Sequence, residues 1–592
     1  MSKTDTIFTF ETQHGKCIMQ TEELGICQSI EELTNSELFA DVVKKFITHL
    51  RRHDSPLLGI FAGKTVDEKG IQCLLNLLRM LSKTRIDGEE LFQIQKGDWI
   101  KDPELLSAFV EALYNYWRTF ERFLIYHPSG KERLDPRAYH AFNQTMEQFT
   151  GLVRTTYRQV QENITGDHPK VYRQVCAGAQ IGLVTANKEW PCVSKKYSEL
   201  CAVPMIRQIL LVPPLVIDPP MNTRSGQFQQ VNINPLMGQE LRADKWLCYP
   251  AKVGPLLIHV FFSRKFIELG CSLANLFELA SEKELQRTPD AICVYGISPD
   301  SCISQYCLSS AEFFDDEENN MLVGVIPGAS QFGYFGYLKK MILTLHNIKM
   351  MKQKRMPFHG ALVQILLKDG SNSTVLIIGD TGTGKSETLE AFRALSSKHL
   401  RCMIIIADDM GSLEIGENQI LRGYGTEIGA FVRLDDLQPG YALGQIDRAI
   451  IMSSQKVNAR AVLPITTLAE VLKGYKIDFI LYANNYEEVD EDHLIVERFD
   501  FKEDAIRVFR DGTSMAKGTT TSVGVGHCYF ANPFGPVQYK NLHDVLAELH
   551  FQTAFDSGVF VGQIRTRLGI PGWEIKGPKE VAKTLLDLIS SQ

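Results

Sequence analysis

Apolar residues in the first third of the chain recur at three- and four-residue steps, the spacing that places them on one face of an α-helix. The pattern covers residues near 37–52, residues near 68–83 and the segment after Asp102-Pro103. An Asp-Pro pair is typical of a helix start, because the carboxylate caps exposed backbone N–H groups and proline suits the first turn. Asp135-Pro136 repeats this signal before a polar helix. We therefore expect a mainly helical N-terminal domain over residues 1–166.

After Thr165-Gly166-Asp167, short apolar runs bounded by Gly, Pro, Asn and Asp replace the helical pattern. Such runs are typical of strands buried in a mixed sheet, with helices between some of them. They cover residues 208–217, 256–262, 291–297, 322–327, 361–367, 374–380 and 403–409. The segment 511–535 is instead rich in Gly and Thr, and its composition fits either a surface loop or a mobile lid. The fold class predicted beyond residue 166 is α/β.

The composition narrows the classes of function. With 44% hydrophobic and 22% charged residues over 592 positions, the chain has the profile of a folded protein rather than a disordered one. A net charge of −7, from 63 basic and 70 acidic residues, argues against nucleic-acid binding through bulk charge. No apolar run reaches about 18 residues and the N-terminus has no secretory pattern, so we expect no membrane span. The 13 cysteines form no C-x-x-C pair, which favours reduced thiols and a cytoplasmic location.

One motif points to chemistry. Residues 379–386 match the phosphate-loop pattern G-x-x-x-x-G-K-[ST], with an apolar run before them and a helix-like segment after them. Glycines let consecutive backbone N–H groups converge on phosphate oxygens, and the lysine and the final hydroxyl suit the terminal phosphates and a magnesium ion. We therefore expect phosphate binding by Gly379, Asp380, Thr381, Gly382, Thr383, Gly384, Lys385 and Ser386.

Two carboxylates follow the next apolar run. Asp408 and Asp409 end the segment 403–409. Acidic side chains at the end of a strand beside a phosphate loop suit metal coordination and base catalysis. Adjacent side chains on a strand point to opposite faces, so we expect the two aspartates to differ in role. A capped turn that uses the Asp-Asp pair is the structural alternative.

These segments resemble two related groups of proteins. Residues 358–366, the phosphate loop and the Ala-Asp-Asp segment are similar to HPr kinase, a bacterial protein-serine kinase, and to phosphoenolpyruvate carboxykinase. The flanks favour the carboxykinases: residues 334–340 resemble their Y-G-G-x-x-K-K segment, Asn458-Ala459-Arg460 resembles their N-T-R segment, and residues 572–589 resemble their C-terminus. A weaker similarity places Arg224 in the family's substrate-arginine loop.

The resemblance implies a carboxykinase-type P-loop fold in two lobes, residues 167–330 and 331–592. It also implies the conversion of oxaloacetate and a nucleoside triphosphate to phosphoenolpyruvate, carbon dioxide and a nucleoside diphosphate. By this similarity Lys340, His359 and Asp409 would bind Mn²⁺, with Lys340 as a neutral amine. Lys385, Ser386 and Asp408 would serve Mg²⁺ and the phosphates, Arg460 the transferring phosphoryl group, and Tyr334 and Arg224 the organic acid.

Three departures from the family pattern leave the phosphoryl donor open between ATP, GTP and pyrophosphate. Thr381 replaces a serine, Ala459 replaces the threonine of N-T-R, and residues 517–521 replace a stretch that carries an arginine. Two other functions also stay open. One is an HPr-kinase-like kinase, in which Asp408 would deprotonate a hydroxyl of a protein or small molecule. The other is a non-catalytic nucleotide-binding module whose helical N-terminal domain binds a protein partner.

Overall fold

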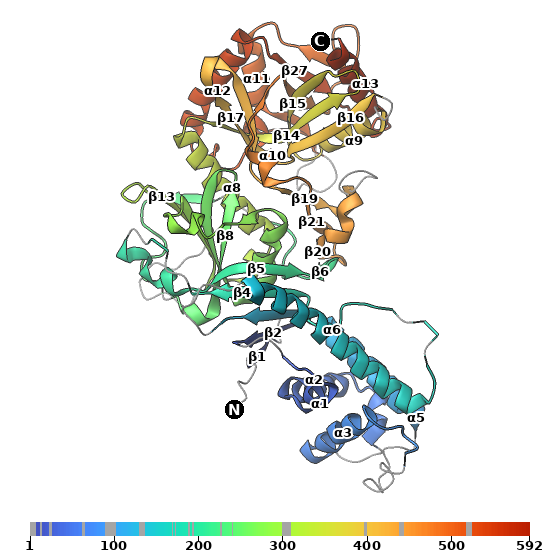
Figure 1. Ribbon diagram of the computed structural model, residues 1–592. Coiled ribbons are helices and arrows are strands. Elements are labelled where there is room, and N and C mark those ends of the chain that lie inside the picture. Colours follow the sequence, from blue (N-terminus) through green and yellow to red (C-terminus); the bar gives the residue numbers. More distant parts are fainter. Residues whose placement is uncertain are drawn as a thin grey trace. The chain divides into compact units, whose positions relative to one another are not determined.

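The computed structural model describes residues 7–591 apart from 12–14, 23–25, 62–65, 89–101, 129–135, 169, 172, 188–189, 192–193, 225–227, 240, 299–309, 396–398, 437–442 and 517–523. The protein is mixed α/β, with several mixed sheets. It divides into two compact units, Met1–Asn187 with Ile206–Val212, and Lys188–Met205 with Pro213–Gln592 (Figure 1). These units do not coincide with the three domains expected from the sequence, whose boundaries stay a prediction. Within the described ranges, every helix is too short or too polar to cross a bilayer.

The helices of the first unit begin where the sequence pattern places them. The segment after Asp102-Pro103 forms the expected helix. Asp102 caps it by accepting a hydrogen bond from the Leu105 amide at 2.9 Å. The helical segments expected near 37–52 and 68–83 are also present. The helices are α1 (Ile30–Asn35), α2 (Glu37–Arg52), α3 (Glu68–Leu81), α5 (Pro103–Thr119) and α6 (Pro136–Thr165). Their apolar faces share one core.

A sheet accompanies these helices, although the sequence pattern indicated only helices up to residue 166; its last strand overlaps the expected strand 208–217. Its strands are ordered β1 (Ile7–Glu11), β2 (Lys16–Thr21), β3 (Glu121–Tyr126), β4 (Ile181–Ala186) and β5 (Met205–Leu211). The β1–β2 pair is antiparallel, whereas β2–β3 and β3–β4 are parallel. The first unit therefore contains both helices and a sheet.

The second unit contains a mixed sheet whose central strands are almost fully buried. Its order is β8 (Trp246–Val253), β9 (Leu256–Ser263), β11 (Ala291–Ile297), β13 (Met321–Pro327), β12 (Glu312–Asp316) and β7 (Gln229–Val231), with β10 (Glu278–Leu279) beside β8. The expected strands 256–262, 291–297 and 322–327 lie at its centre. Helix α8 (Phe335–Lys352) packs on this sheet and is buried on nearly every side, which explains why its sequence shows no polar face.

A second mixed sheet carries the phosphate loop. Its order is β22 (Tyr475–Lys476), β18 (Leu421–Gly425), β17 (Met410–Ile415), β14 (Met356–Leu367), β15 (Asn372–Ile378), β23 (Phe479–Asn484), β27 (Phe560–Arg565) and β24 (Val496–Arg498), with β16 (Leu400–Ala407) also paired to β14. Strands β15, β23 and β27 are parallel, so their carboxyl ends share one edge of the sheet. Ligand sites of open α/β sheets lie at this kind of edge.

Helices cover both faces of this second sheet. Leu481 and Ala483 share a core with the helices α9 (Lys385–Leu395) and α13 (Lys576–Ser590), whereas the Tyr482 ring meets Phe509 of α11 (Lys502–Asp511). This follows from the alternation of side chains along β23. The remaining elements are α7 (Ile267–Ser272), α10 (Leu468–Leu472), α12 (Lys540–Asp556), the hairpin of β25 (Thr513–Met515) and β26 (Val525–His527), and a sheet of β19 (Gly429–Arg433), β21 (Arg460–Pro464), β20 (Ile450–Met452) and β6 (Leu215–Ile217).

Candidate functional site

The predicted phosphate loop lies between β15 and α9, as its sequence context indicates. Gly382 and Gly384 have φ values of 78° and 93°, in the left-handed region that glycine tolerates best. A side chain at Gly384 would also collide with Thr566, because its Cβ would lie 2.8 Å from the Thr566 Cβ. Conformation and space therefore both require glycine at this position.

The side chain of Lys385 folds back over the loop that precedes it. Its Nζ donates to the carbonyl oxygens of Gly379 at 2.5 Å and Asp380 at 2.9 Å. Burial lowers the pKa of Lys385, and the carboxylates of Asp380, Asp409 and Asp408 act to raise it. The amine is thus held at the centre of the loop, where phosphate oxygens would compete with the two carbonyls for its hydrogen bonds.

The other loop residues divide into buried and exposed positions. Thr383 is buried, and its hydroxyl donates to the Asp380 carbonyl at 2.7 Å. The side chains of Thr381 and Ser386 are exposed, so the Ser386 hydroxyl is open to solvent at the start of α9. An exposed hydroxyl at this position can reach a metal ion bound to phosphates.

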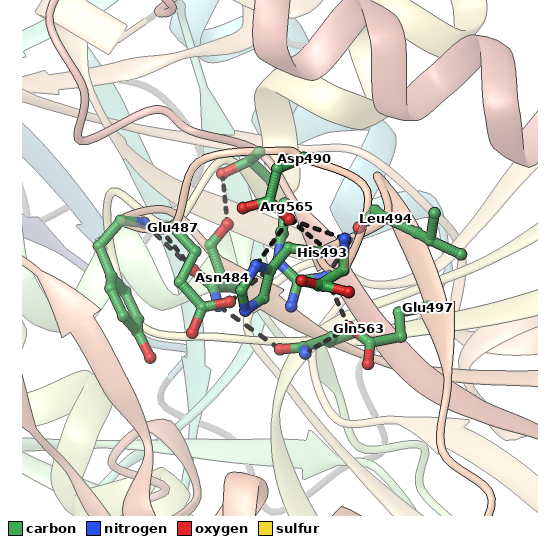
Figure 2. Close-up of polar contacts among 11 residues, drawn as sticks. Asn484, Glu487, Asp490, His493, Leu494, Glu497, Gln563 and Arg565 are labelled. Atoms are coloured by element: carbon green, nitrogen blue, oxygen red, sulfur yellow. Dashed lines mark hydrogen bonds and ion pairs between the residues drawn. The ribbon is translucent and has the colours of Figure 1, made fainter.

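A buried polar network supports the loop from the neighbouring strand ends. Asn485 donates to the Gly382 carbonyl at 3.0 Å, and Thr566 donates to the Thr383 carbonyl at 2.7 Å. Figure 2 shows the network beside these residues: Arg565, only 2% exposed, contacts Glu487 at 2.9 Å and Glu497 at 2.6 Å. The sequence analysis did not identify these supporting residues, because they follow β23 and β27 without a recognisable motif.

Asp408 and Asp409 lie between the strands β16 and β17, which pair with successive parts of β14. Strand β16 pairs with the second half of β14 and β17 pairs with its first half, so the Asp-Asp step joins them. The backbone carbonyl of Asp409 accepts a hydrogen bond from the Gly360 amide at 3.0 Å. This places the Asp409 side chain beside His359, as the sequence analysis predicted. Asp408 contributes negative charge at Lys385.

His359 and Asp409 form the closest pair of the predicted metal ligands. The His359 Nε2 lies 2.9 Å from the Asp409 Oδ1, and the His359 Nδ1 contacts the Ala531 carbonyl oxygen. A carbonyl only accepts, so Nδ1 carries a proton, and Nε2 either donates a second proton to the Asp409 carboxylate or presents a lone pair to it. Two facing acceptors need a proton or a cation between them. Neighbouring ligands of one octahedral cation lie about 3 Å apart.

Lys339, rather than its neighbour Lys340, contacts the Asp409 carboxylate. Its Nζ lies 2.7 Å from the Asp409 Oδ2 and 3.2 Å from the Glu427 Oε1. Burial would raise the pKa of Asp409, but Lys339 and His359 hold it well below its usual range. Burial raises the pKa of Glu427 to about 8, although Lys339 acts to lower it. Glu427 had no sequence signal beyond being an acidic residue in a Gly-rich stretch.

Lys340 turns toward an aromatic ring instead. Its Nζ lies 4.6 Å from the centre of the Phe534 ring. Burial and the positive charge of Arg224 lower the pKa of Lys340 to about 8, while Asp409 acts to raise it. A lysine with such a pKa reaches the neutral form that metal ligation requires far more readily than an exposed lysine.

The residues predicted to hold the organic acid converge on the same region. Tyr334 is buried, which raises its pKa, and the charges of Arg460, Lys339 and Arg224 oppose this effect. Arg460 donates from Nε to the Asn458 Oδ1 at 3.1 Å, and Asn458 donates to the Asn222 carbonyl at 2.7 Å. The segments of Arg460 and Arg224 are therefore tied together. The Arg224 guanidinium also lies 5.9 Å from the Phe534 ring centre.

The donor set restricts which groups could hold a metal ion. Among the described residues, no group of three His, Cys, Asp or Glu side chains is placed to bind one. A cation at His359 and Asp409 would thus need Lys340, a substrate oxygen or water as further ligands. The variant segment 517–521, named above for its missing arginine, lies outside the described residues.

No protein-family model matches this sequence, and comparison with curated proteins finds no significant match.

Proposed function

We propose that this protein is a metal-dependent phosphoenolpyruvate carboxykinase-like enzyme of the cytoplasm, with a carboxykinase-type P-loop fold. The observation that carries the proposal is the convergence of a phosphate-loop lysine, a His–Asp pair and several cations in one region. Lys339 and His359 contact the Asp409 carboxylate, and the charge of Asp409 acts to raise the pKa of Lys385. Carboxylate, phosphate and enolate oxygens are the anions that such a region suits.

Different residues would bind the organic acid and the phosphoryl donor of the proposed reaction. Arg224 and Tyr334 would hold the carboxylate of oxaloacetate, while Lys385 and Arg460 would hold the phosphates of the donor. Carbon dioxide leaves when the C–C bond to the carboxylate breaks. The electron pair of that bond forms the enolate of pyruvate. The enolate oxygen then attacks the terminal phosphorus and the diphosphate leaves. Mn²⁺ at His359, Asp409 and Lys340, with Mg²⁺ at Ser386 and Asp408, would supply charge stabilisation of the enolate and the phosphoryl group.

The positions of Tyr334 and Lys340 favour this proposal over a hydroxyl kinase. A kinase needs a base for its acceptor hydroxyl, but it does not need a second buried lysine with a lowered pKa beside the phosphate loop. Lys340 and Tyr334 lie in the same cationic region as Arg460 and Arg224. This region fits a small dianionic acid better than a protein hydroxyl.

The reverse reaction provides the test. Purified protein is incubated with phosphoenolpyruvate, labelled bicarbonate and Mn²⁺, with ADP, GDP or inorganic phosphate in separate reactions. We expect labelled oxaloacetate, trapped by reduction to malate, in one of the three reactions, which also identifies the donor as ATP, GTP or pyrophosphate.

Lys385→Ala is the matched control. We expect turnover to fall at least about 1,000-fold while circular dichroism stays unchanged, because the phosphate charge loses its main cation. Absence of labelled oxaloacetate with all three acceptors, in a protein that still binds nucleotide, would refute the carboxykinase proposal. Unchanged turnover in Lys385→Ala would refute the role of the loop.

A further inference from the structure

The helices of the first unit enclose an apolar pocket at the place where α1, α2, α3, α5 and α6 meet. Its cavity volume is about 90 Å³, or about 680 Å³ when the space open to solvent at its mouth is included. Leu78, Val110, Leu113, Phe149 and Val153 contribute to its wall, which carries no charged side chain. Water in such a pocket finds few hydrogen-bond partners, so an apolar occupant that displaces it is favoured.

Three polar side chains in this wall, those of Trp117, Thr156 and Tyr157, already have hydrogen-bond partners. The Trp117 Nε1 donates to the Ala177 carbonyl at 2.6 Å, and the Thr156 hydroxyl donates to the Leu152 carbonyl at 2.8 Å. Tyr157 donates its hydroxyl hydrogen bond to Glu111. The pocket therefore offers hydrocarbon contact and few hydrogen bonds, which suits an acyl chain rather than a sugar or a nucleotide.

A stacked pair of tyrosines separates this pocket from a wide polar cleft. The rings of Tyr114 and Tyr157 lie 4.0 Å apart at an angle of 10°, and both residues line the pocket and the cleft. The apolar pocket and the polar cleft are therefore adjacent, with these two side chains between them.

Arginines gather on the polar side of that wall. Arg118, Arg154, Arg158 and Arg173 line the cleft, against the carboxylates of Glu104, Glu111 and Asp167. Arg154 donates to the Val175 carbonyl and the Gln174 amide oxygen, both at 2.9 Å, and Arg118 donates to the Asn115 amide oxygen at 3.2 Å.

The charges of these arginines reach the tyrosine wall. Burial raises the pKa of Tyr114, and Arg118, Arg154, Arg122 and Arg158 all act to lower it. The guanidinium carbon of Arg118 also lies 5.8 Å from the centre of the Tyr114 ring. Positive charge is therefore concentrated beside a tyrosine that lines both the pocket and the cleft.

We propose that the first unit binds an anionic amphiphile, whose acyl chain fills the apolar pocket and whose carboxylate or phosphate head lies among Arg118, Arg154 and Arg158. The juxtaposition of a charge-free pocket with arginines across one aromatic wall selects both ends of such a molecule. This site is independent of the proposed reaction, because its residues belong to a different unit from the phosphate loop.

Calorimetric titration of the full chain below micelle-forming concentrations tests the head and the tail separately. Dodecanoate and dodecyl phosphate distinguish the two anionic heads, acetate has a head without a tail, and dodecyltrimethylammonium has the tail with a positive head. We expect saturable binding of at least one anionic amphiphile and neither of the other two. Equal binding of the cationic amphiphile, or no saturable binding of either anionic one, would overturn the proposal.

Variants locate the site. We expect Val153→Trp, which fills the pocket, and Arg118→Gln/Arg158→Gln, which removes two charges, each to weaken binding about tenfold or more. The charge-matched control is Lys69→Gln/Lys83→Gln, whose residues line neither space. Leu113→Phe is the second filling variant if Val153→Trp fails to fold. Unchanged affinity in both the filling and the arginine variants would place any binding elsewhere.

A spectroscopic measurement confirms the position of the tail. A dodecanoate brominated at its terminal carbon should quench Trp117, which lines the pocket. We expect this quenching to disappear in Trp117→Phe while calorimetric binding persists. Identical quenching in the variant would show that the chain contacts other tryptophans.

Discussion

Lys339 and Lys340 are adjacent residues with different surroundings. Consecutive residues of a helix are about 100° apart, so one ammonium lies at Asp409 and Glu427 while the other faces Phe534. The sequence analysis identified the pair by its resemblance to a family segment, which does not tell which lysine contacts which carboxylate. That assignment depends on the rotation of α8, which tertiary packing sets.

Lys340→Met tests the role of the lysine with the lowered pKa. We expect the Mn²⁺ concentration needed for half-maximal activity to rise about tenfold or more, because a metal ligand is lost, while nucleotide affinity changes little. Mn²⁺ activation curves and nucleotide titrations measure the two effects. Lys352→Met, on the same helix but paired with Asp315, is the control. Equal losses in metal activation and nucleotide affinity would argue against metal ligation by Lys340.

Glu427 should make stability depend on pH. Its pKa of about 8 in the folded chain exceeds the ordinary value of 4.5, so the folded state retains a proton that the unfolded state releases. The stabilisation is therefore fully present below about pH 4.5 and is lost as the pH rises to about 8. We expect Glu427→Gln to reduce this loss of the free energy of unfolding, measured by urea denaturation at pH 5 and 8. Glu417→Gln, at an exposed position, should behave like the wild type. A wild-type-like pH dependence in Glu427→Gln would contradict the assignment.

At the scale of elements, local signals predicted well wherever the chain itself determines the structure. Asp102-Pro103 starts α5, and the motif at 379–386 joins a strand to a helix. The strands β1 to β3 were missed because residues 1–166 were assigned from their helical periodicity, and β4 was not among the apolar runs identified beyond that point. Asn485 and Thr566 were missed as well, since they reach the phosphate loop from strand ends 103 and 183 residues away along the chain.

Gly384→Ala should disrupt the phosphate loop, whereas Gly370→Ala should not. Both glycines have left-handed backbones, with φ values of 93° and 100°, and alanine costs about 1 kcal/mol at such a position. Only at Gly384 does the new Cβ meet a neighbour, Thr566, whereas nothing lies within 4 Å of a Cβ at Gly370. We expect nucleotide affinity, measured by titration, to fall about tenfold or more in Gly384→Ala alone. Equal affinities in the two variants would show that the contact with Thr566 does not shape the loop.

At the scale of the whole molecule, the two compact units have separate apolar cores. Arg122 organises the first unit. It is 2% exposed, and its guanidinium donates to several backbone carbonyls, among them Gly178 at 2.7 Å and Phe120 at 2.7 Å. These carbonyls come from the end of α5 and from the segment before β4, which are far apart in the chain. No pattern of the sequence could indicate this role, because arginine is usually exposed.

Arg122→Met should therefore weaken the first unit and leave the second intact. Methionine preserves much of the side-chain volume but leaves several buried carbonyls unpaired, at about 1–3 kcal/mol each. We expect the midpoint of thermal unfolding, followed by circular dichroism, to fall by several degrees, while nucleotide affinity at 25 °C stays within about twofold of the wild type. The exposed Arg51→Met should change neither quantity. A parallel loss of nucleotide affinity in Arg122→Met would mean that the fold of the phosphate-loop unit depends on the integrity of the first.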